Sequence, residues 1–561
     1  MLPVQSTIKK LCALVLVTAV IMSGGFVSAA SAGGISAAPL NPKFVQWQKN
    51  TDEAKTSSPQ KGTTNSRGRA ASYGYVPSPI NWSGLVGNKV YSVVKAADNR
   101  GAIPATYDLR SEMPAVRNQG DYGTCWTFSA MAAAESNLIH EKGILTKDNA
   151  DLSEWYLAYY GHNDESDDLP SFTYGTEKHY DSGGNDWMSA AILSRGTGFL
   201  EESSAEYPNP QDEAHDYKPE VQSRKYKLKN ALYLGDLGVK EVRLKGDRIN
   251  MIKEAIMEYG AVSIGIYQSD FIADSGAYFE DATDWYANHA VTIVGWDDNY
   301  AVSNFTSPAN TPSGPGAWIV RNSWGDDYGD EGYYYVSYEE GSLNDGVVYD
   351  TDSAPDNEKI YQYDPLGLCD FFAYTIGLND AYFANIFTAS RNENINSVAF
   401  YTSIPESQCN IKIYKDCGDD PIGGTLIAEK NVTVTAPGYN TVDLDSAVEI
   451  PENVKFSVVV SISGLETTDY AMPVEYPFSD TWSEKATASA GQSFISMDGI
   501  EWEDLTGQVA NANICIKAFG TIDDPDPDPG TGGSGGCSTG PVMLILLGLG
   551  VLPFVYRGRK Q

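Results

Sequence analysis

Cys125 lies in a stretch of sequence that can turn a thiol into a nucleophile. The segment Gln119–Trp126 contains glycines that permit a tight turn, and helix-favouring residues follow from Ala130 to Glu135. Cys125 is therefore expected at a helix N-terminus, where the positive end of the helix dipole favours the reactive thiolate. We expect the Gln119 side chain and the Cys125 backbone N–H to form an oxyanion hole. An isolated cysteine would more often be a buried structural residue. The prediction of a nucleophile therefore requires a second residue that can accept the thiol proton.

His289 is the histidine best placed to act as that base. The chain has five histidines, and His289 begins the apolar stretch His289–Trp296, which predicts a strand. Asn322 ends a second strand-like stretch, Trp318–Asn322, and is expected to orient the imidazole without adding a negative charge. Trp324 is expected to shield the Asn–His hydrogen bond from water. A core histidine bonded to a backbone carbonyl is the simpler alternative for His289.

Taken together, these stretches resemble the papain family of cysteine peptidases over roughly residues 103–338. The resemblance implies an α+β fold, with a two-lobed catalytic domain whose cleft separates a helical half from a β-rich half. It implies catalytic roles for Cys125, His289, Asn322 and Gln119, and substrate-binding roles for Gly183, Gly184, Asn288 and Trp324. The spacings from Cys125 to His289 and from His289 to Asn322 are longer than is usual in the family. Insertions near 201–245 and 303–316 are expected to account for the extra length. Asn185 and Asp186 follow the glycine pair and suggest a polar or basic preference in the main specificity pocket.

A different pattern begins after the polar break at 351–357. Short alternating runs such as Ser397–Tyr401, Asn410–Tyr414 and Val454–Val460 are separated by turn residues, which predicts an all-β sandwich domain over 355–520. This region resembles the lectin-like domains found behind some papain-type domains. It could attach to surface glycans or serve only as a structural partner, because Trp482 and Trp502 fit a core as well as a sugar-stacking platform.

The two ends of the chain have the composition of targeting segments. Residues 1–32 combine lysines, an apolar run and small residues, which predicts a secretory signal peptide. Residues 33–102 are hypothesised to be a pro-region. Asp-Pro alternation predicts an extended linker over 521–536, and residues 537–561 predict a C-terminal membrane anchor or sorting signal. The catalytic domain is assigned to 103–350. Export to the cell surface, with membrane attachment through the tail or extracellular release, is expected.

Composition narrows the function further. The 561 residues include 74 acidic and 39 basic residues, for a formal charge of -35, which disfavours nucleic acid as a partner. The sequence lacks the usual zinc motifs, so neither a metal nor a cofactor is expected. Four cysteines allow one or two disulfides, with Cys409–Cys417 as a local pair. We predict an exported cysteine endopeptidase acting on proteins or peptides. An adhesin or glycan-binding protein with a peptidase-like scaffold is the alternative.

Overall fold

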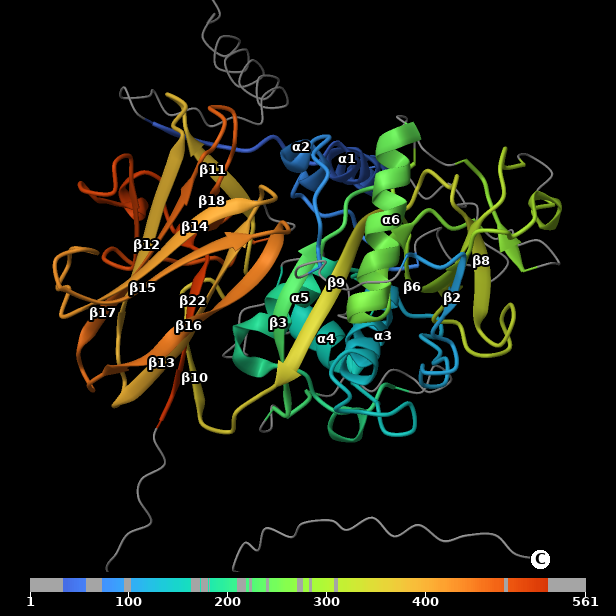
Figure 1. The fold of residues 1–561 in the computed structure, drawn as a ribbon, viewed down its shortest axis with the longest axis horizontal. Helices are drawn as coiled ribbons and strands as arrows, with labels where there is room; N and C mark the ends of the chain where they lie inside the picture. Colours follow the sequence, from blue (N-terminus) through green and yellow to red (C-terminus); the bar gives the residue numbers. More distant parts are fainter. Residues whose placement is uncertain are drawn as a thin grey trace, which may run out of the picture. The chain divides into compact units, whose positions relative to one another are not determined.

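The computed structural model describes thirteen parts of the chain (Figure 1). They are residues 34–56, 73–94, 102–162, 172, 180, 182–208, 218–220, 224–238, 242–269, 276–281, 285–306, 311–478 and 483–522. The predicted signal peptide and the anchor or sorting signal lie outside these ranges, as does all but the start of the linker. No helix in the described ranges is long and apolar enough to span a membrane.

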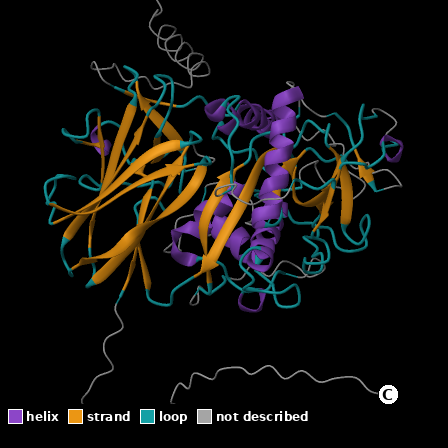
Figure 2. Cartoon of the chain, in the orientation of Figure 1, coloured by secondary structure: helices purple, strands orange, loops and turns teal. Residues whose placement is uncertain are grey.

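The catalytic domain combines helices with a sheet (Figure 2). Its helical elements are α3 (Cys125–His140), α4 (Glu154–Gly161), α5 (Asp186–Ile192), the π-turn η1 (Leu193–Thr197), α6 (Val242–Tyr259) and the 3₁₀ turns η2 (Glu202–Ser204) and η3 (Val302–Asn304). Its strands are β2 (Thr106–Asp108), β3 (Tyr226–Tyr233), β4 (Val262–Ile266), β5 (Ala277–Tyr278), β6 (His289–Asp297), β7 (Ala317–Arg321), β8 (Tyr333–Ser337) and β9 (Asn344–Ser353). α3 is buried from Cys125 to Leu138, which makes it the central helix of the domain.

The following domain is almost entirely β-structure, as predicted. Its strands are β10 (Glu358–Tyr361), β11 (Asp370–Tyr374), β12 (Asp380–Thr388), β13 (Glu393–Thr402), β14 (Ser407–Lys415), β15 (Thr425–Val434), β16 (Gly438–Ile450), β17 (Lys455–Ser463), β18 (Met472–Glu475), β19 (Ser493–Ser496), β20 (Glu503–Asp504), β21 (Asn513–Ile514) and β22 (Ile516–Thr521), with one 3₁₀ turn, η4 (Leu505–Gly507). Alternate side chains of β13, β14 and β17 enter one apolar core, which is how period-two patterning makes a sandwich.

One sheet joins the two domains. Its twelve strands run in the order β10-β22-β13-β16-β3-β9-β4-β6-β7-β8-β5, with β2 on β6. The joint is β16 on β3, where Gly438 lies opposite Leu232 and Tyr439 opposite Ala231. β3 falls inside the stretch 201–245 that the sequence suggested was an insertion. It is in fact the strand that connects the catalytic sheet to the β domain.

The N-terminal segment contacts both domains. Its elements are β1 (Ile35–Ala37), α1 (Pro42–Thr56) and α2 (Trp82–Val86). β1 adds an antiparallel strand to β11. Trp82 of α2 stacks on Trp187 and Tyr233 of the catalytic domain, with ring centroids 4.3 and 5.5 Å apart, and meets Phe371 of the β domain edge-on at 5.6 Å. This segment therefore packs into the seam between the domains.

The suggested disulfides do not form. Cys125 and the four cysteines of the β domain are all free and buried, the latter being Cys369, Cys409, Cys417 and Cys515. Cys409 lies within β14 and packs in the sandwich core, whereas Cys417 packs in a separate small cluster. Their closeness in sequence therefore does not bring the two sulfurs together, and the suggestion of a local pair is wrong.

Candidate active site

Three secondary-structure ends bring the predicted residues together. Cys125 is the first residue of α3, His289 is the first residue of β6, and Asn322 follows the last residue of β7. Each placement agrees with the local sequence signal. β6 and β7 pair antiparallel, with Thr292 opposite Arg321. The histidine at the start of one strand therefore lies beside the asparagine at the end of the other.

The asparagine fixes the ring of His289. His289 Nε2 lies 2.8 Å from Asn322 Oδ1, which also accepts the backbone N–H of Ser323 at 2.8 Å. Since that oxygen accepts, Nε2 carries the proton, and in the neutral ring Nδ1 is left as the basic atom. Nδ1 is buried and has no hydrogen-bond partner within the described structure. Trp324 stacks on the ring at 4.8 Å with a 25° interplanar angle.

The Cys125 sulfur lies against the same strand. Its Sγ accepts the backbone N–H of Ala290, the neighbour of His289, at 3.3 Å. Burial raises the pKa of the thiol to about 12, although the N–H groups of Ala290 and Trp126 oppose the shift. Burial also lowers the pKa of His289 to about 4, and the hydrogen bond that the ring donates to Asn322 opposes this shift. Burial is the largest influence on both groups, and in each group it favours the neutral form.

Gln119 holds a peptide carbonyl of the chain itself. Its Nε2 donates to the carbonyl oxygen of Tyr73 at 3.1 Å and to that of Tyr122 at 2.7 Å. Its Oε1 accepts the hydroxyl of Ser323, which fixes the orientation of the amide. The amide is therefore already directed at a peptide carbonyl, as an oxyanion-hole donor must be.

Residues 73–76 run between the predicted substrate-binding residues. Tyr73 N–H donates to Asn288 O at 3.1 Å. Gly184 pairs in parallel with Tyr75: Gly184 N–H donates to Gly74 O, and Val76 N–H donates to Gly184 O, each at 2.9 Å. Gly74 has φ +107°, and a Cβ there would lie 2.1 Å from the Gly123 backbone. Only glycine allows this approach. We call residues 73–76 the inserted segment.

Sequence reasoning did not find the inserted segment. The only signal was a return of aromatic and apolar residues after position 73, which no motif connects to the site. The structure also shows what Asn185 and Asp186 contact, the two residues that suggested a polar specificity pocket. The Asn185 side chain caps α5 by accepting from the N–H groups of Trp187 and Met188. Asp186 is buried and accepts the Tyr349 hydroxyl at 3.0 Å. Both side chains are thus engaged inside the domain.

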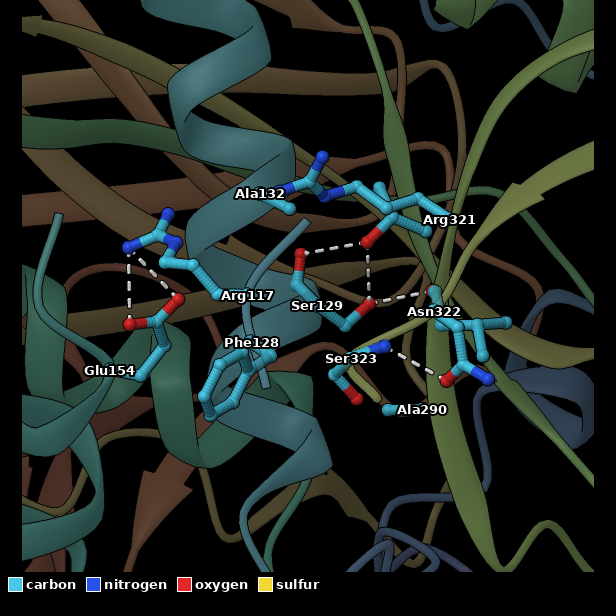
Figure 3. A pocket seen from close by; sticks show the side chains of 11 residues that line it. Arg117, Phe128, Ser129, Ala132, Glu154, Ala290, Arg321, Asn322 and Ser323 are labelled. Atoms are coloured by element: carbon cyan, nitrogen blue, oxygen red, sulfur yellow. Dashed lines mark hydrogen bonds and ion pairs between the residues drawn. The ribbon is translucent and has the colours of Figure 1, made fainter. Parts of the chain in front are cut away.

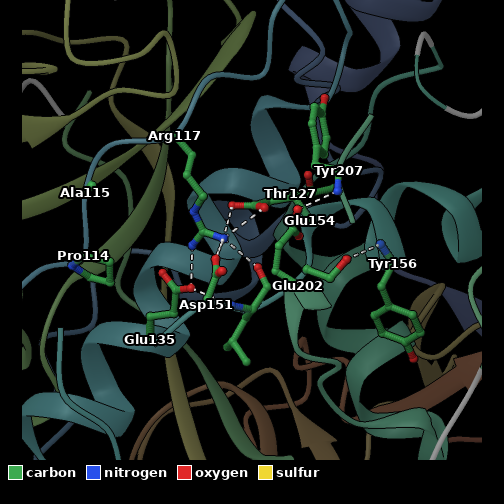
Figure 4. A network of polar contacts seen from close by, with 12 residues as sticks. Pro114, Ala115, Arg117, Thr127, Glu135, Asp151, Glu154, Tyr156, Glu202 and Tyr207 are labelled. Carbon is green, nitrogen blue, oxygen red and sulfur yellow. Dashed lines mark hydrogen bonds and ion pairs between the residues drawn. The ribbon is translucent and has the colours of Figure 1, made fainter. Parts of the chain in front are cut away.

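Two polar networks support the site. Ser129 of α3 lines the pocket of Figure 3, and its hydroxyl donates to Val291 O of β6 at 2.6 Å. The same hydroxyl lies 2.7 Å from the hydroxyl of Ser263 on β4. These two contacts tie the helix to β4 and β6. Figure 4 shows Arg117, two residues before Gln119, surrounded by carboxylates. These carboxylates are Glu135, Asp151 and Glu154.

The Arg117 network anchors the loop that carries Gln119. Glu135 and Glu154 are buried, and burial raises the pKa of Glu154 despite the arginine. Breaking one partner of such a network leaves an uncompensated buried charge. A single arginine before the loop gave no signal in the sequence. Within the described ranges, no three His, Cys, Asp or Glu side chains gather as a metal site.

Known proteins resemble this chain in both of its domains. The family model for papain family cysteine proteases matches residues 103–351, and that for lectin-like domains matches residues 360–520. Cathepsin S of Mus musculus is 30% identical over 41% of this chain and 58% of its own length. A cysteine protease of Blomia tropicalis is 26% identical over 45% of this chain and 67% of its own length. The match therefore spans roughly two thirds or less of these relatives.

Two solved structures share this architecture. The cysteine protease and lectin-like domains of Cwp84, a surface layer associated protein of Clostridium difficile, share 23% identity and a TM-score of 0.68, covering 88% of this chain and all of that one. Cwp84 after propeptide cleavage is 26% identical with a TM-score of 0.62, covering 74% of this chain and 99% of that one. The predicted fold class is confirmed: a papain-like protease domain, matched over residues 103–351, is followed by a lectin-like β domain, matched over residues 360–520.

Proposed function

We propose that the papain-type cysteine peptidase domain hydrolyses peptide bonds with Cys125 as nucleophile, His289 as base, Asn322 as its orienting residue and Gln119 in the oxyanion hole. The observation that carries this proposal is the Tyr73 carbonyl on the Gln119 amide. A substrate carbonyl held there would be attacked by Cys125, which begins α3 and accepts the Ala290 N–H, with His289 supplying a ring whose Nδ1 has no hydrogen-bond partner among the described residues. That set of groups is what acyl transfer to a thiol requires.

In the proposed mechanism, Nδ1 of His289 takes the thiol proton of Cys125, and the sulfur bonds to the substrate carbonyl carbon. The resulting oxyanion is held by Gln119 Nε2–H and the Cys125 N–H. The imidazolium returns its proton to the leaving amine as the C–N bond breaks. A water molecule, deprotonated by the same nitrogen, then cleaves the thioester and restores the thiol.

The chain is proposed to be made latent by its own N-terminal segment. The inserted segment occupies Gly184, Asn288 and Gln119, so a substrate must displace it. While it is bound, the neutral thiol is also a poor nucleophile, because the thiolate is the reactive form. Cwp84 has been solved after cleavage of a propeptide, which offers a parallel. We extend the proposal to 33–102 as the pro-region, with export to the cell surface.

The β domain is proposed to act first as a structural partner of the catalytic domain. β16 extends the catalytic sheet, and the described aromatic candidate Trp502 packs against a buried cluster of the sandwich. Trp482 lies outside the described residues. The purified protein can be tested for binding to a glycan array. Binding would favour the alternative of an adhesin or glycan-binding protein.

The test is hydrolysis of casein by the full chain and by chain from which the N-terminal segment has been removed by processing. Cys125→Ala should lower the activity of processed protein by about 10⁴-fold or more. Cys409→Ala, a buried thiol of the β domain, is the matched control and should leave it unchanged. Equal loss in both variants, or full activity in Cys125→Ala, would refute the assignment.

A further inference from the structure

The side chain of Tyr75 fills an enclosed site next to the proposed catalytic residues. Tyr75 is 1% exposed, and its backbone pairs with Gly184. A Cβ added at Gly265 would lie 2.9 Å from Tyr75 Cζ, 2.8 Å from Asn344 Oδ1 and 3.1 Å from Ala287 Cβ. The glycine therefore makes room for the ring, and these neighbours bound it. We call this space the Tyr75 site.

The polar atoms around the Tyr75 site are acceptors. The Tyr75 hydroxyl donates to Asp345 Oδ2 at 3.2 Å. Asn344 is 2% exposed, and its Oδ1 has no hydrogen-bond partner among the described residues. A phenol supplies one donor, so it cannot satisfy both the carboxylate and this amide oxygen. A buried acceptor that is left without a donor is destabilising. Tyr75 thus fills the site sterically but leaves its hydrogen bonding incomplete.

More negative charge lies behind the site. The Asp345 backbone N–H donates to Asp236 Oδ1 at 3.1 Å, and Asp345 holds φ +51°, a left-handed conformation that is uncommon for a residue other than glycine. Burial, followed by the charge of Asp236, raises the pKa of Asp345 to about 8, and Lys43 of α1 opposes this shift. The N-terminal segment therefore brings one cation to this acidic group while it is bound.

We propose that the Tyr75 site is a specificity subsite of the peptidase and that it selects a lysine or arginine side chain of the substrate through Asp345 and Asn344. This inference rests on the proposed function. An ammonium has three N–H donors and a guanidinium has five, so either satisfies the carboxylate and the amide oxygen together. A cation also restores the ionised form of Asp345. When the N-terminal segment leaves, Tyr75 and Lys43 leave with it, and the site becomes open to substrate.

The test is to assay a positional-scanning library of fluorogenic peptides with the protein from which the N-terminal segment has been removed by processing. We expect lysine and arginine to exceed leucine by about 10-fold or more in kcat/KM at one position. Asp345→Asn should reduce the rates for basic residues at least 10-fold while leaving those for apolar residues within about 2-fold. Asp445→Asn, an exposed aspartate of β16, is the matched control and should change neither.

The outcomes separate the two proposals. Cleavage with no basic preference, or with tyrosine and phenylalanine preferred over lysine, would overturn the subsite and leave the peptidase intact. Absence of cleavage from every peptide would instead count against the proposed function. If Asp345→Asn unfolds, Asn344→Ala keeps the test decisive: it should lower the preference for basic residues at least 3-fold, and an unchanged preference would refute the role of the amide.

Discussion

The buried thiols of Cys125 and Cys409, one in each domain, differ in the parts of the chain that pack around them. Burial raises the pKa of Cys125 to about 12, and it does the same for Cys409. Cys409 is covered by the strands of a closed sandwich. Cys125 begins a helix, lies beside the strand that carries His289, and has the inserted segment nearby. We propose that the inserted segment contributes to the burial of Cys125 and is displaceable, whereas Cys409 is buried by a permanent core. The following changes test that contrast.

The largest effect is expected from loss of the proposed oxyanion-hole donor in the catalytic domain. Gln119→Ala removes the amide donor to the carbonyl and should lower kcat/KM of the processed protein by about 10²–10³-fold. Gln408→Ala, on an exposed position of β14, should have no effect on peptide hydrolysis. A Gln119→Ala protein with full kcat/KM would show that the Tyr73 contact is incidental.

Alkylation by iodoacetamide should separate the two kinds of thiol. At pH 8 a thiol with a pKa of about 12 is only about 10⁻⁴ ionised, whereas an ordinary cysteine is about a quarter ionised. Cys125 of the full chain should therefore react at least about 100-fold more slowly than after processing, and its rate should keep rising with pH above 9. Mass spectrometry locates the label. Cys409 should stay unlabelled in both forms, and early labelling of Cys409 would break the comparison.

A smaller effect is expected from disturbing the inserted segment without cutting it. Gly74→Ala places a methyl against the Gly123 backbone and should weaken seating of the segment. A loss of about 1.4 kcal/mol would raise the activity of the full chain about 10-fold. Gly87 also has a positive φ, +60°, but a Cβ there would have nothing within 4 Å, so the Gly87→Ala protein should stay latent. Equal activation in both variants would assign the effect to backbone strain.

The smallest change concerns the joint between the domains. A Cβ at Gly438, which has φ +122°, would lie 2.1 Å from Ala231 O on β3. Gly438→Ala should lower the free energy of unfolding by about 2 kcal/mol, measured by urea denaturation. Gly464→Ala, with φ +78° and open space around it, is the control. A loss that is no larger than the control's would show that the joint contributes little.

The sequence predicted the parts of the site whose signals are local. Cys125 before a helical run and His289 at the start of an apolar strand were found in those places because each setting is encoded within about ten residues. Residues 73–76 could not be recognised, since their structure depends on pairing with Gly184, over a hundred positions away. The same reason explains β3, whose partners β9 and β16 are distant, and the failed suggestion of a Cys409–Cys417 bridge. Asp345 was missed because the role we propose for it depends on its neighbours in space.

The uninterrupted ladder from β10 to β8 has a mechanical consequence. Hydrogen bonds between β16 and β3 make the catalytic strands and one sheet of the sandwich parts of a single twisted plate. A load applied to the β domain is then transmitted directly to the strands that carry His289 and Asn322, rather than being absorbed by a hinge. We therefore expect the proposed active site to keep a fixed distance from any partner that the β domain binds.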